Sequence, residues 1–173
     1  MKNKPAIRRI IKKGHVVSTR KGKFVLELSR RIMDDLRSYC KKIKVVGSIR
    51  RKEKNPVDID IVLIPKSQED KKKIRALLIK KGQIIEDGEQ QLSVKVQGVK
   101  IELYYTVPEE WGAALLAYSS EFGAGIGLRV VAKKKGFKLN QHGLWKGSRR
   151  VAGKTEEEIY RALGRPYKEP WNR

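Results

Sequence analysis

The segment "VDIDIVLI" at residues 57–64 restricts the fold more than any other part of the sequence. Apolar residues alternate along it, and a period of two is typical of a strand that buries one face. Asp58 and Asp60 then point together to the opposite face. Two carboxylates this close repel each other, and one tends to stay protonated unless a cation neutralises both. The pattern therefore predicts a divalent-metal site, and its alternative is a solvent-facing pair at a sheet edge.

A third carboxylate lies on a later strand with the same alternation. In "VKIELYY", residues 99–105, Glu102 is opposite in phase to the apolar residues Ile101 and Leu103. If this strand lies beside the first, three carboxylates share one patch. Mg²⁺ prefers hard oxygen ligands, and a patch of this kind suits a pair of ions. Taken alone, Glu102 is equally compatible with an exposed position on a half-solvated strand.

A Gly-Ser pair follows the short apolar strand "IKVV", ten residues before the paired aspartates. Gly47 allows the backbone to approach a ligand closely. Backbone N–H groups and the Ser48 hydroxyl can hold phosphate oxygens, and Arg51 can add a charge-assisted contact. A phosphate cradle followed by a carboxylate pair predicts a site for a nucleoside triphosphate. The alternative is that Ser48 simply caps a surface helix.

The charge of the chain points to a polyanionic partner. The 173 residues include 41 Lys and Arg against 19 Asp and Glu, a net charge of +22. A field of this sign attracts nucleic acid first and an anionic membrane surface second. The sequence contains no apolar run of about 18 residues, so it predicts no transmembrane helix. The lone Cys40 and the lack of an apolar leader favour an intracellular protein that is not secreted.

The remaining sequence predicts alternating strands and helices, with a change near Pro108 from a β-rich core to a helical C-terminal lobe. The predicted elements are a hairpin of residues 15–18 and 23–28 around Gly22, a helix over 29–42 capped by Ser29, a strand over 43–48, a helix over 67–81 capped by Ser67, two strands within 91–107 around Gly98, and helices over 108–120, 127–137 and 155–163.

Taken together, these motifs resemble the family X DNA polymerases, of which DNA polymerase beta is a member. The matching segments are "GSIRR" with "VDIDIVLI", then "IELYYTVPEEWGAALLAYSS", "AKKKGFKLNQHGLW" and "EEEIYRALGRPYKEPWNR". The resemblance implies an α+β fold. A nucleotidyltransferase palm over 24–107, a mixed sheet with helices, would precede a small α/β C-terminal lobe over 108–173 that binds the nascent base pair. Residues 1–23 would be a basic arm or the start of a hairpin. We find no region for a lyase or helix-hairpin-helix domain.

The resemblance also implies roles for particular residues. It implies two Mg²⁺ ions, with Mn²⁺ as an alternative, held by Asp58, Asp60 and Glu102. A triphosphate would lie against Gly47, Ser48 and Arg51. Tyr118 falls in the sugar-discriminating segment, and Arg129 falls on the helix that faces the templating base. From the net charge we predict DNA phosphate contacts at Lys133, Lys134 and Lys135.

Two positions depart from the family pattern. Glu102 stands where the family usually has Asp, and Ser119-Ser120 stands where it usually has Thr-Gly. The sequence favours a monomeric, template-directed DNA polymerase that acts on gapped or primed DNA and deoxynucleoside triphosphates, in short-gap repair. The alternatives are a template-independent or RNA-directed nucleotidyltransferase, and a non-catalytic nucleic-acid-binding protein on the same fold.

Overall fold

The computed structural model describes residues 8–12, 15–19 and 21–173, and the side chains from residue 21 onward except 122–124. Its helices are α1 (Lys23–Arg37), α2 (Gly47–Arg50), α3 (Gln68–Lys81), α4 (Trp111–Ser119), α5 (Phe122–Lys134) and α6 (Glu156–Ala162), with 3-10 turns η1 (Pro108–Glu110) and η2 (Pro170–Asn172). Its strands are β1 (Arg8–Lys12), β2 (His15–Thr19), β3 (Cys40–Val45), β4 (Ile59–Pro65), β5 (Gln83–Asp87), β6 (Gln91–Val96), β7 (Val99–Tyr105), β8 (Lys138–Asn140), β9 (Gly143–Lys146) and β10 (Arg149–Ala152).

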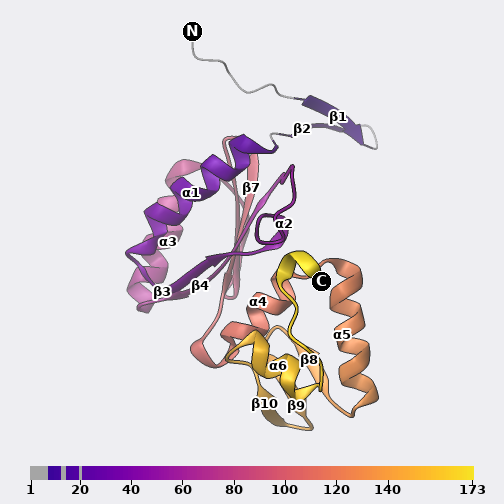
Figure 1. Ribbon diagram of the computed structural model, residues 1–173. Coiled ribbons are helices and arrows are strands. Elements are labelled where there is room, and N and C mark those ends of the chain that lie inside the picture. Colours follow the sequence, from indigo (N-terminus) through magenta and orange to yellow (C-terminus); the bar gives the residue numbers. More distant parts are fainter. Residues whose placement is uncertain (1–7, 13–14, 20) are drawn as a thin grey trace.

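A mixed five-stranded sheet forms the first half of the molecule. Its strand order is β3-β4-β7-β6-β5, with β4 and β7 parallel and the other neighbours antiparallel. Helices α1 and α3 cover one face of this sheet (Figure 1). The core between them is built from apolar residues of both layers, among them Ile32, Leu36, Ile61, Ile74 and Leu103. The polar side chains of β4 and β7 lie on the opposite face of the sheet, which α4 partly covers.

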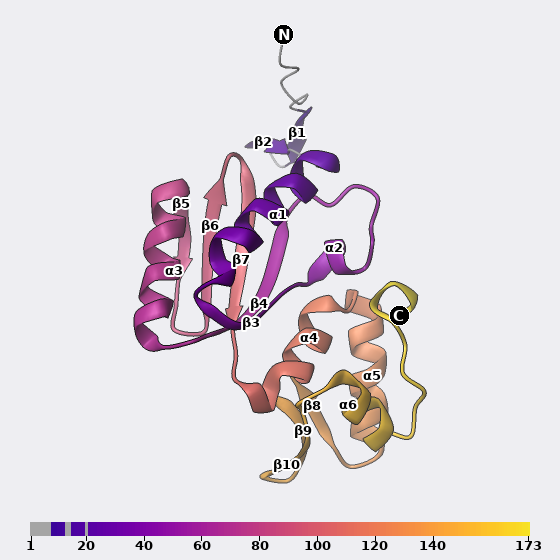
Figure 2. The same cartoon turned by 60° about the vertical axis from the view of Figure 1, so that its left-hand side comes forward.

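The second half of the molecule is a smaller lobe of helices and a three-stranded sheet. Helices α4, α5 and α6 and the sheet β10-β9-β8 lie together at one end of the large sheet (Figure 2). Their own core includes Leu116, Leu144 and Ile159. Helix α4 also packs on the large sheet, where Leu115 joins a separate cluster with Val62. The α+β fold class expected from the sequence is confirmed.

Several local signals were predicted correctly. The Ser67 side chain accepts a hydrogen bond from the Asp70 backbone N–H at 3.0 Å and caps α3. Gly98 turns β6 into β7 with φ +82°. Thr155 caps α6 in the same way, through the Glu158 backbone N–H at 3.1 Å. Pro108 occupies the first turn of η1, which leads into α4.

The prediction for residues 15–42 was right for a strand at 15–18 and a helix over 29–37, and wrong for the partner of that strand, for residues 23–28 and for the ends of the helix. Strand β2 pairs with β1 rather than with residues 23–28, and residues 23–37 form one helix. Val25, Leu28, Ile32 and Leu36 are all buried on a single helical face. The short apolar run "FVLEL" fits a strand as well as a helix, and burial against the sheet decides for the helix. Ser29 lies buried inside α1 and caps nothing.

The bounds of two strands also differ from those predicted, and one edge strand was missed. Strand β3 covers residues 40–45 rather than 43–48, because Gly47 already begins the short helix α2. Strand β4 begins at Ile59, so Val57 precedes the buried face and is 47% exposed. Strand β5 was not predicted. Its residues are all exposed at the edge of the sheet, so its sequence shows no alternation of buried and polar positions.

Candidate active site

The carboxylates of β4 and β7 are brought together by strand register. Asp60 pairs directly with Glu102 in the parallel ladder, and the flanking pair Ile59 and Ile101 is completely buried on the helix-covered face. Side chains alternate across a strand, so both carboxylates lie on the opposite face. Asp58 lies half-buried at the entry to β4. The hypothesis that the two strands are neighbours and share one acidic patch is therefore confirmed.

Burial and mutual repulsion disfavour the charged forms of the two aspartates. Burial, and then the charges of Asp58 and Glu102, raise the pKa of Asp60 to about 7. Burial and the charge of Glu102 raise the pKa of Asp58. Glu102 accepts hydrogen bonds from Lys100 Nζ at 2.8 Å and from Gln91 Nε2 at 3.1 Å. Lys100 thus contacts Glu102 rather than the two aspartates, and a divalent cation would supply positive charge beside them.

The three carboxylates do not form a closed metal cage in this conformation. Within residues 21–173, no group of three potential ligands converges tightly enough to enclose an ion. Glu102 instead pairs with Lys100, which relieves its repulsion from the aspartates. The donor set still fits Mg²⁺, because it consists of hard oxygens on adjacent strands with raised aspartate pKa values. A bound ion would have to draw Glu102 away from Lys100.

The pKa of Asp60 predicts how the stability of the metal-free protein depends on pH. In the unfolded chain this carboxyl ionises near 3.8, whereas in the folded protein its pKa is about 7. Between these values the folded state binds the extra proton, so its stability is highest below the lower pKa and falls as pH rises. Denaturant unfolding of wild type and Asp60→Asn in a chelator tests this prediction. The unfolding free energy of wild type minus that of the variant should fall from pH 4 to 7. A difference that stays constant over this range would contradict the raised pKa.

Gly47 lies directly against Asp60. Its φ is +60°, and a Cβ placed on it would be 2.1 Å from Asp60 Oδ2. The backbone N–H of Val46 donates to the Asp60 carbonyl at 2.8 Å, which fixes this close approach. Only glycine combines such a φ with such a contact at little cost. Glycine at position 47 therefore leaves the space that the Asp60 carboxylate occupies.

Ser48 and Arg51 differ in how ready they are to receive a ligand. The Ser48 hydroxyl is buried and has no hydrogen-bond partner among the described residues, as expected of a group that awaits one. Arg51 already has partners. Its Nε donates to Glu53 at 3.0 Å and its NH1 to the Ser119 carbonyl at 3.3 Å. A phosphate contact by Arg51 would require it to leave Glu53.

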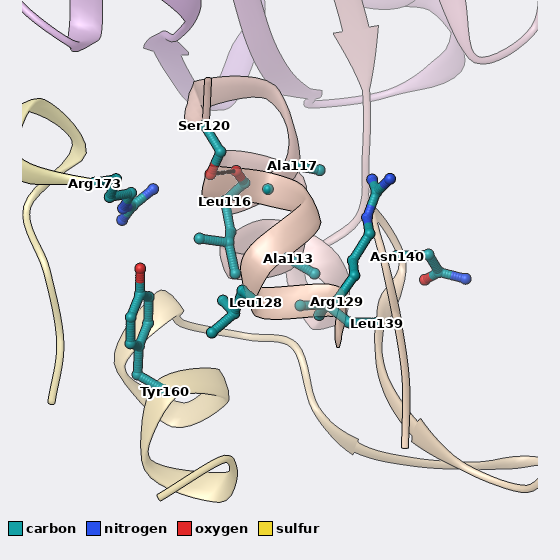
Figure 3. A pocket seen from close by; sticks show the side chains of 11 residues that line it. Ala113, Leu116, Ala117, Ser120, Leu128, Arg129, Leu139, Asn140, Tyr160 and Arg173 are labelled. Carbon is teal, nitrogen blue, oxygen red and sulfur yellow. Dashed lines mark hydrogen bonds between the residues drawn. The ribbon is translucent and has the colours of Figure 1, made fainter. Parts of the chain in front are cut away.

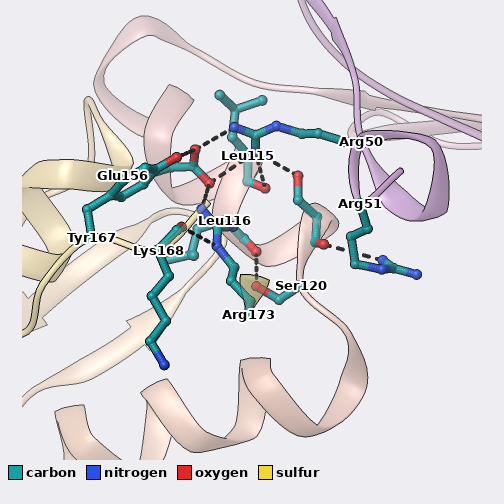
Figure 4. Close-up of polar contacts among 10 residues, drawn as sticks. Arg50, Arg51, Leu115, Leu116, Ser120, Glu156, Tyr167, Lys168 and Arg173 are labelled. Carbon is teal, nitrogen blue, oxygen red and sulfur yellow. Dashed lines mark hydrogen bonds and ion pairs between the residues drawn. The ribbon is translucent and has the colours of Figure 1, made fainter. Parts of the chain in front are cut away.

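The sequence did not predict a buried cluster of paired arginine and glutamate side chains beside this site (Figure 4). Arg50 of α2 donates to Ser119 Oγ at 2.8 Å and forms a bidentate pair with Glu156 of α6, at 3.0 and 2.6 Å. Arg173 donates to the same carboxylate at 2.8 Å, and the Tyr167 hydroxyl lies 3.4 Å from it. The cluster joins the loop after β3 to the C-terminal lobe. Three glutamates in the first turn of a helix normally face solvent, so the sequence carries no signal for it.

Tyr118 is stacked rather than exposed. The centre of its ring lies 3.7 Å from that of the Tyr104 ring, with an angle of 13° between the planes. Tyr104 follows Glu102 by two residues on the same face of β7, and its hydroxyl donates to Asp60 Oδ1 at 3.4 Å. Burial and the charge of Asp60 raise the pKa of Tyr104, so the hydroxyl keeps its proton. The alternation of β7 could have identified Tyr104, because it places this residue on the carboxylate face.

Comparison with known proteins agrees with this geometry. Residues 125–173 match the family described as DNA polymerase beta thumb. The Repair DNA polymerase X of African swine fever virus, isolate Warthog/Namibia/Wart80/1980, is 31% identical over 166 residues, which cover 83% of this chain and 95% of the relative. The protein of the same name from isolate Tick/South Africa/Pretoriuskop Pr4/1996 is 30% identical with the same coverage. This chain belongs to the family X DNA polymerases.

The predicted DNA-binding residues of this family X polymerase lie within the segment that matches the thumb family. Arg129, Lys133, Lys134 and Lys135 are exposed on or just after α5. The lysines lie at the end of α5 that is farther from the large sheet (Figure 1). Arg129 also borders a cavity of about 40 Å³ with Ser120, Tyr160 and Arg173 (Figure 3). The structure brings Asp58, Asp60 and Glu102 together, with Gly47 against Asp60 and the Tyr118 ring against Tyr104.

No helix within the described residues has the length and apolar character needed to cross a bilayer.

Proposed function

We propose that this chain is a template-directed DNA polymerase that fills short gaps during DNA repair. It would add a deoxynucleotide to a primer 3′-hydroxyl and release pyrophosphate. The observation that carries the proposal is the pairing of Asp60 with Glu102 on parallel strands, directly beside Gly47 and the unpartnered Ser48 hydroxyl. The African swine fever virus relatives named Repair DNA polymerase X support the same activity.

Two Mg²⁺ ions, or Mn²⁺ in their place, would be held by Asp58, Asp60 and Glu102. When bound, they would supply charge stabilisation for the attacking and leaving oxygens. The remaining steps fall to the chain itself. Ser48 would donate to a triphosphate oxygen, and Arg51 would pair with the triphosphate after leaving Glu53. Catalysis would rest on positioning and on preorganised charge.

The C-terminal lobe would hold the nascent base pair, with Arg129 facing the templating base. Tyr118 would border the sugar of the incoming deoxynucleotide, since it comes from α4 and reaches the carboxylate face of the sheet. The positive charge of the chain would contribute to binding gapped or primed DNA. We propose that the protein acts as a monomer.

Primer extension is the direct test of this function. Gapped and recessed DNA would be incubated with each deoxynucleotide singly, with and without Mg²⁺. The proposal expects Mg²⁺-dependent addition of the nucleotide complementary to the template, with a preference for gapped DNA. Addition that ignores the template would favour a template-independent enzyme, and addition on RNA templates alone would favour an RNA-directed one. DNA binding without any incorporation would identify a non-catalytic binding protein.

The lysine cluster of residues 133–135 predicts the salt dependence of DNA binding. Each neutralised phosphate contributes about 0.9 to the slope of log affinity against log salt concentration. Changing Lys133, Lys134 and Lys135 together to Gln should therefore reduce the slope by about 0.9 for each phosphate that these side chains neutralise in the wild-type complex. The measurement is fluorescence anisotropy of labelled gapped DNA over a range of NaCl concentrations.

A matched variant separates direct phosphate binding from overall charge. Changing Lys71, Lys72 and Lys73 of α3 to Gln also removes three positive charges, but from the helix-covered side of the large sheet. This variant should retain a slope near that of wild type. Equal slopes for the two variants would mean that Lys133, Lys134 and Lys135 contribute only to the net charge.

A further inference from the structure

The buried cluster of Arg50, Arg173 and Glu156 contains more positive than negative charge. Its two guanidinium groups share the single carboxylate of Glu156, and all three side chains are almost completely buried. Within residues 21–173, no other acidic group forms a salt bridge with either guanidinium. A buried charge without a partner is strongly destabilising. One positive charge of the cluster is therefore left for another anion to compensate.

One nitrogen of Arg173 indicates where such an anion would lie. Its Nη2 donates to Glu156 at 2.8 Å, and its Nε donates to the Lys168 carbonyl at 3.0 Å. Its Nη1 is buried and has no hydrogen-bond partner among the described residues. Buried N–H groups are nearly always paired, and this side chain is only 2% exposed. The free nitrogen therefore points to a ligand that these residues do not themselves provide.

The cavity beside Arg173 has the size and the lining for a small anion (Figure 3). Its volume is about 40 Å³, and the described residues that border it include Arg129 and Arg173 but no acidic residue. Tyr160 also lines it, with its hydroxyl pointing toward Arg173. Burial raises the pKa of this hydroxyl, so it keeps its proton and can donate. A water molecule needs about 10–15 Å³ of such space, so a monatomic anion fits and a nucleotide does not.

We propose that this cavity is a chloride site, in which Arg173 Nη1 and the Tyr160 hydroxyl bind the anion and the anion compensates the second guanidinium of the cluster. Chloride supplies the missing negative charge and accepts charge-assisted hydrogen bonds from N–H and O–H donors. A water molecule would satisfy Nη1 but leave the charge uncompensated. The cluster joins α2 to the C-terminal lobe, so chloride stabilises that junction. The inference goes beyond the polymerase activity and does not depend on it.

Urea unfolding of the full chain tests the site in solution. Sodium gluconate, whose anion is too large for the cavity, is exchanged for NaCl at constant ionic strength, so that screening of the +22 net charge does not change. For wild type, each tenfold rise in chloride concentration above the dissociation constant should lower the unfolding equilibrium constant about tenfold. Arg173→Gln leaves Arg50 and Glu156 as a balanced pair, and it should remove this dependence on chloride.

Arg165→Gln is the matched control. It removes the same charge from an exposed position in the same C-terminal segment, and it should keep the chloride dependence of wild type. A second measurement needs no variant: in crystals of the wild-type chain grown in NaBr, anomalous scattering should place a bromide ion against Arg173 Nη1. A water molecule or an empty cavity there would overturn the inference. A chloride dependence that Arg173→Gln retains, or that Arg165→Gln loses equally, would also overturn it.

Discussion

Asp60→Asn is expected to abolish nucleotide incorporation while leaving the protein folded. The substitution keeps the size of the side chain and removes the charge at the centre of the acidic patch, where Asp60 adjoins Gly47 and pairs with Glu102. Metal ions contribute several kcal/mol of charge stabilisation to a transition state of this kind. A loss of about 4 kcal/mol corresponds to a rate about a thousandfold lower. Single-turnover incorporation on gapped DNA measures this loss.

The stability of the same variant should change in the opposite direction. Removing one of the mutually repelling carboxylates should raise the melting temperature in a chelator at about pH 7.5, where the wild-type patch is charged. Asp34→Asn is the control, because Asp34 is exposed on α1, on the far side of the sheet from the patch. It should leave both incorporation and stability unchanged. Full incorporation by a folded Asp60→Asn protein would remove the metal-site hypothesis.

Glu156→Ala is expected to cost about 3–5 kcal/mol of stability, the usual effect of removing one member of a buried ion cluster. The Glu156 side chain is 4% exposed, and those of its partners Arg50 and Arg173 are 10% and 2% exposed. Without the carboxylate, two guanidinium groups would remain buried with no compensating charge. The cluster also joins the α2 loop to the lobe, so the substitution should loosen that lobe. Denaturant unfolding followed by circular dichroism gives the free energy.

Glu157→Ala provides the comparison for this prediction. Glu157 is the next residue of α6 and is exposed, so its removal should change stability by no more than about 0.5 kcal/mol. Equal losses of stability for the two variants would show that helix propensity or the helix dipole, rather than the buried cluster, accounts for the effect.

Local patterns were enough to predict the parts of the site that depend on one strand or one turn. The alternation in "VDIDIVLI" and "VKIELYY" places Asp60 and Glu102 on the polar face of their strands, because side chains alternate wherever a strand forms. The Ser67 and Thr155 caps follow from hydrogen bonds within four residues. The neighbouring arrangement of the two strands was a hypothesis, and the parallel register of β4 and β7 confirms it.

The long-range contacts were not predictable in this way. Residues 23–28 form a helix because their apolar side chains reach the core of the sheet, and a five-residue apolar run does not distinguish helix from strand. Arg51 was predicted to contact a phosphate, and no local pattern indicated its hydrogen bond to Glu53. Arg50 and Glu156 are separated by 106 residues, and nothing near either one indicates that it is buried.

The sequence by itself determined that Asp60 and Glu102 lie on polar strand faces, that Asp58 and a Gly-Ser pair precede the first of these strands, and that the chain carries a large positive charge. These properties depend on residue type and on short-range geometry. Only the tertiary structure decided that Tyr118 stacks on Tyr104, that Tyr104 contacts Asp60, and that an ion pair between Arg50 and Glu156 joins α2 to the C-terminal lobe. The reason is that such contacts arise from how separate elements pack, and packing depends on burial across the whole chain rather than on any local pattern.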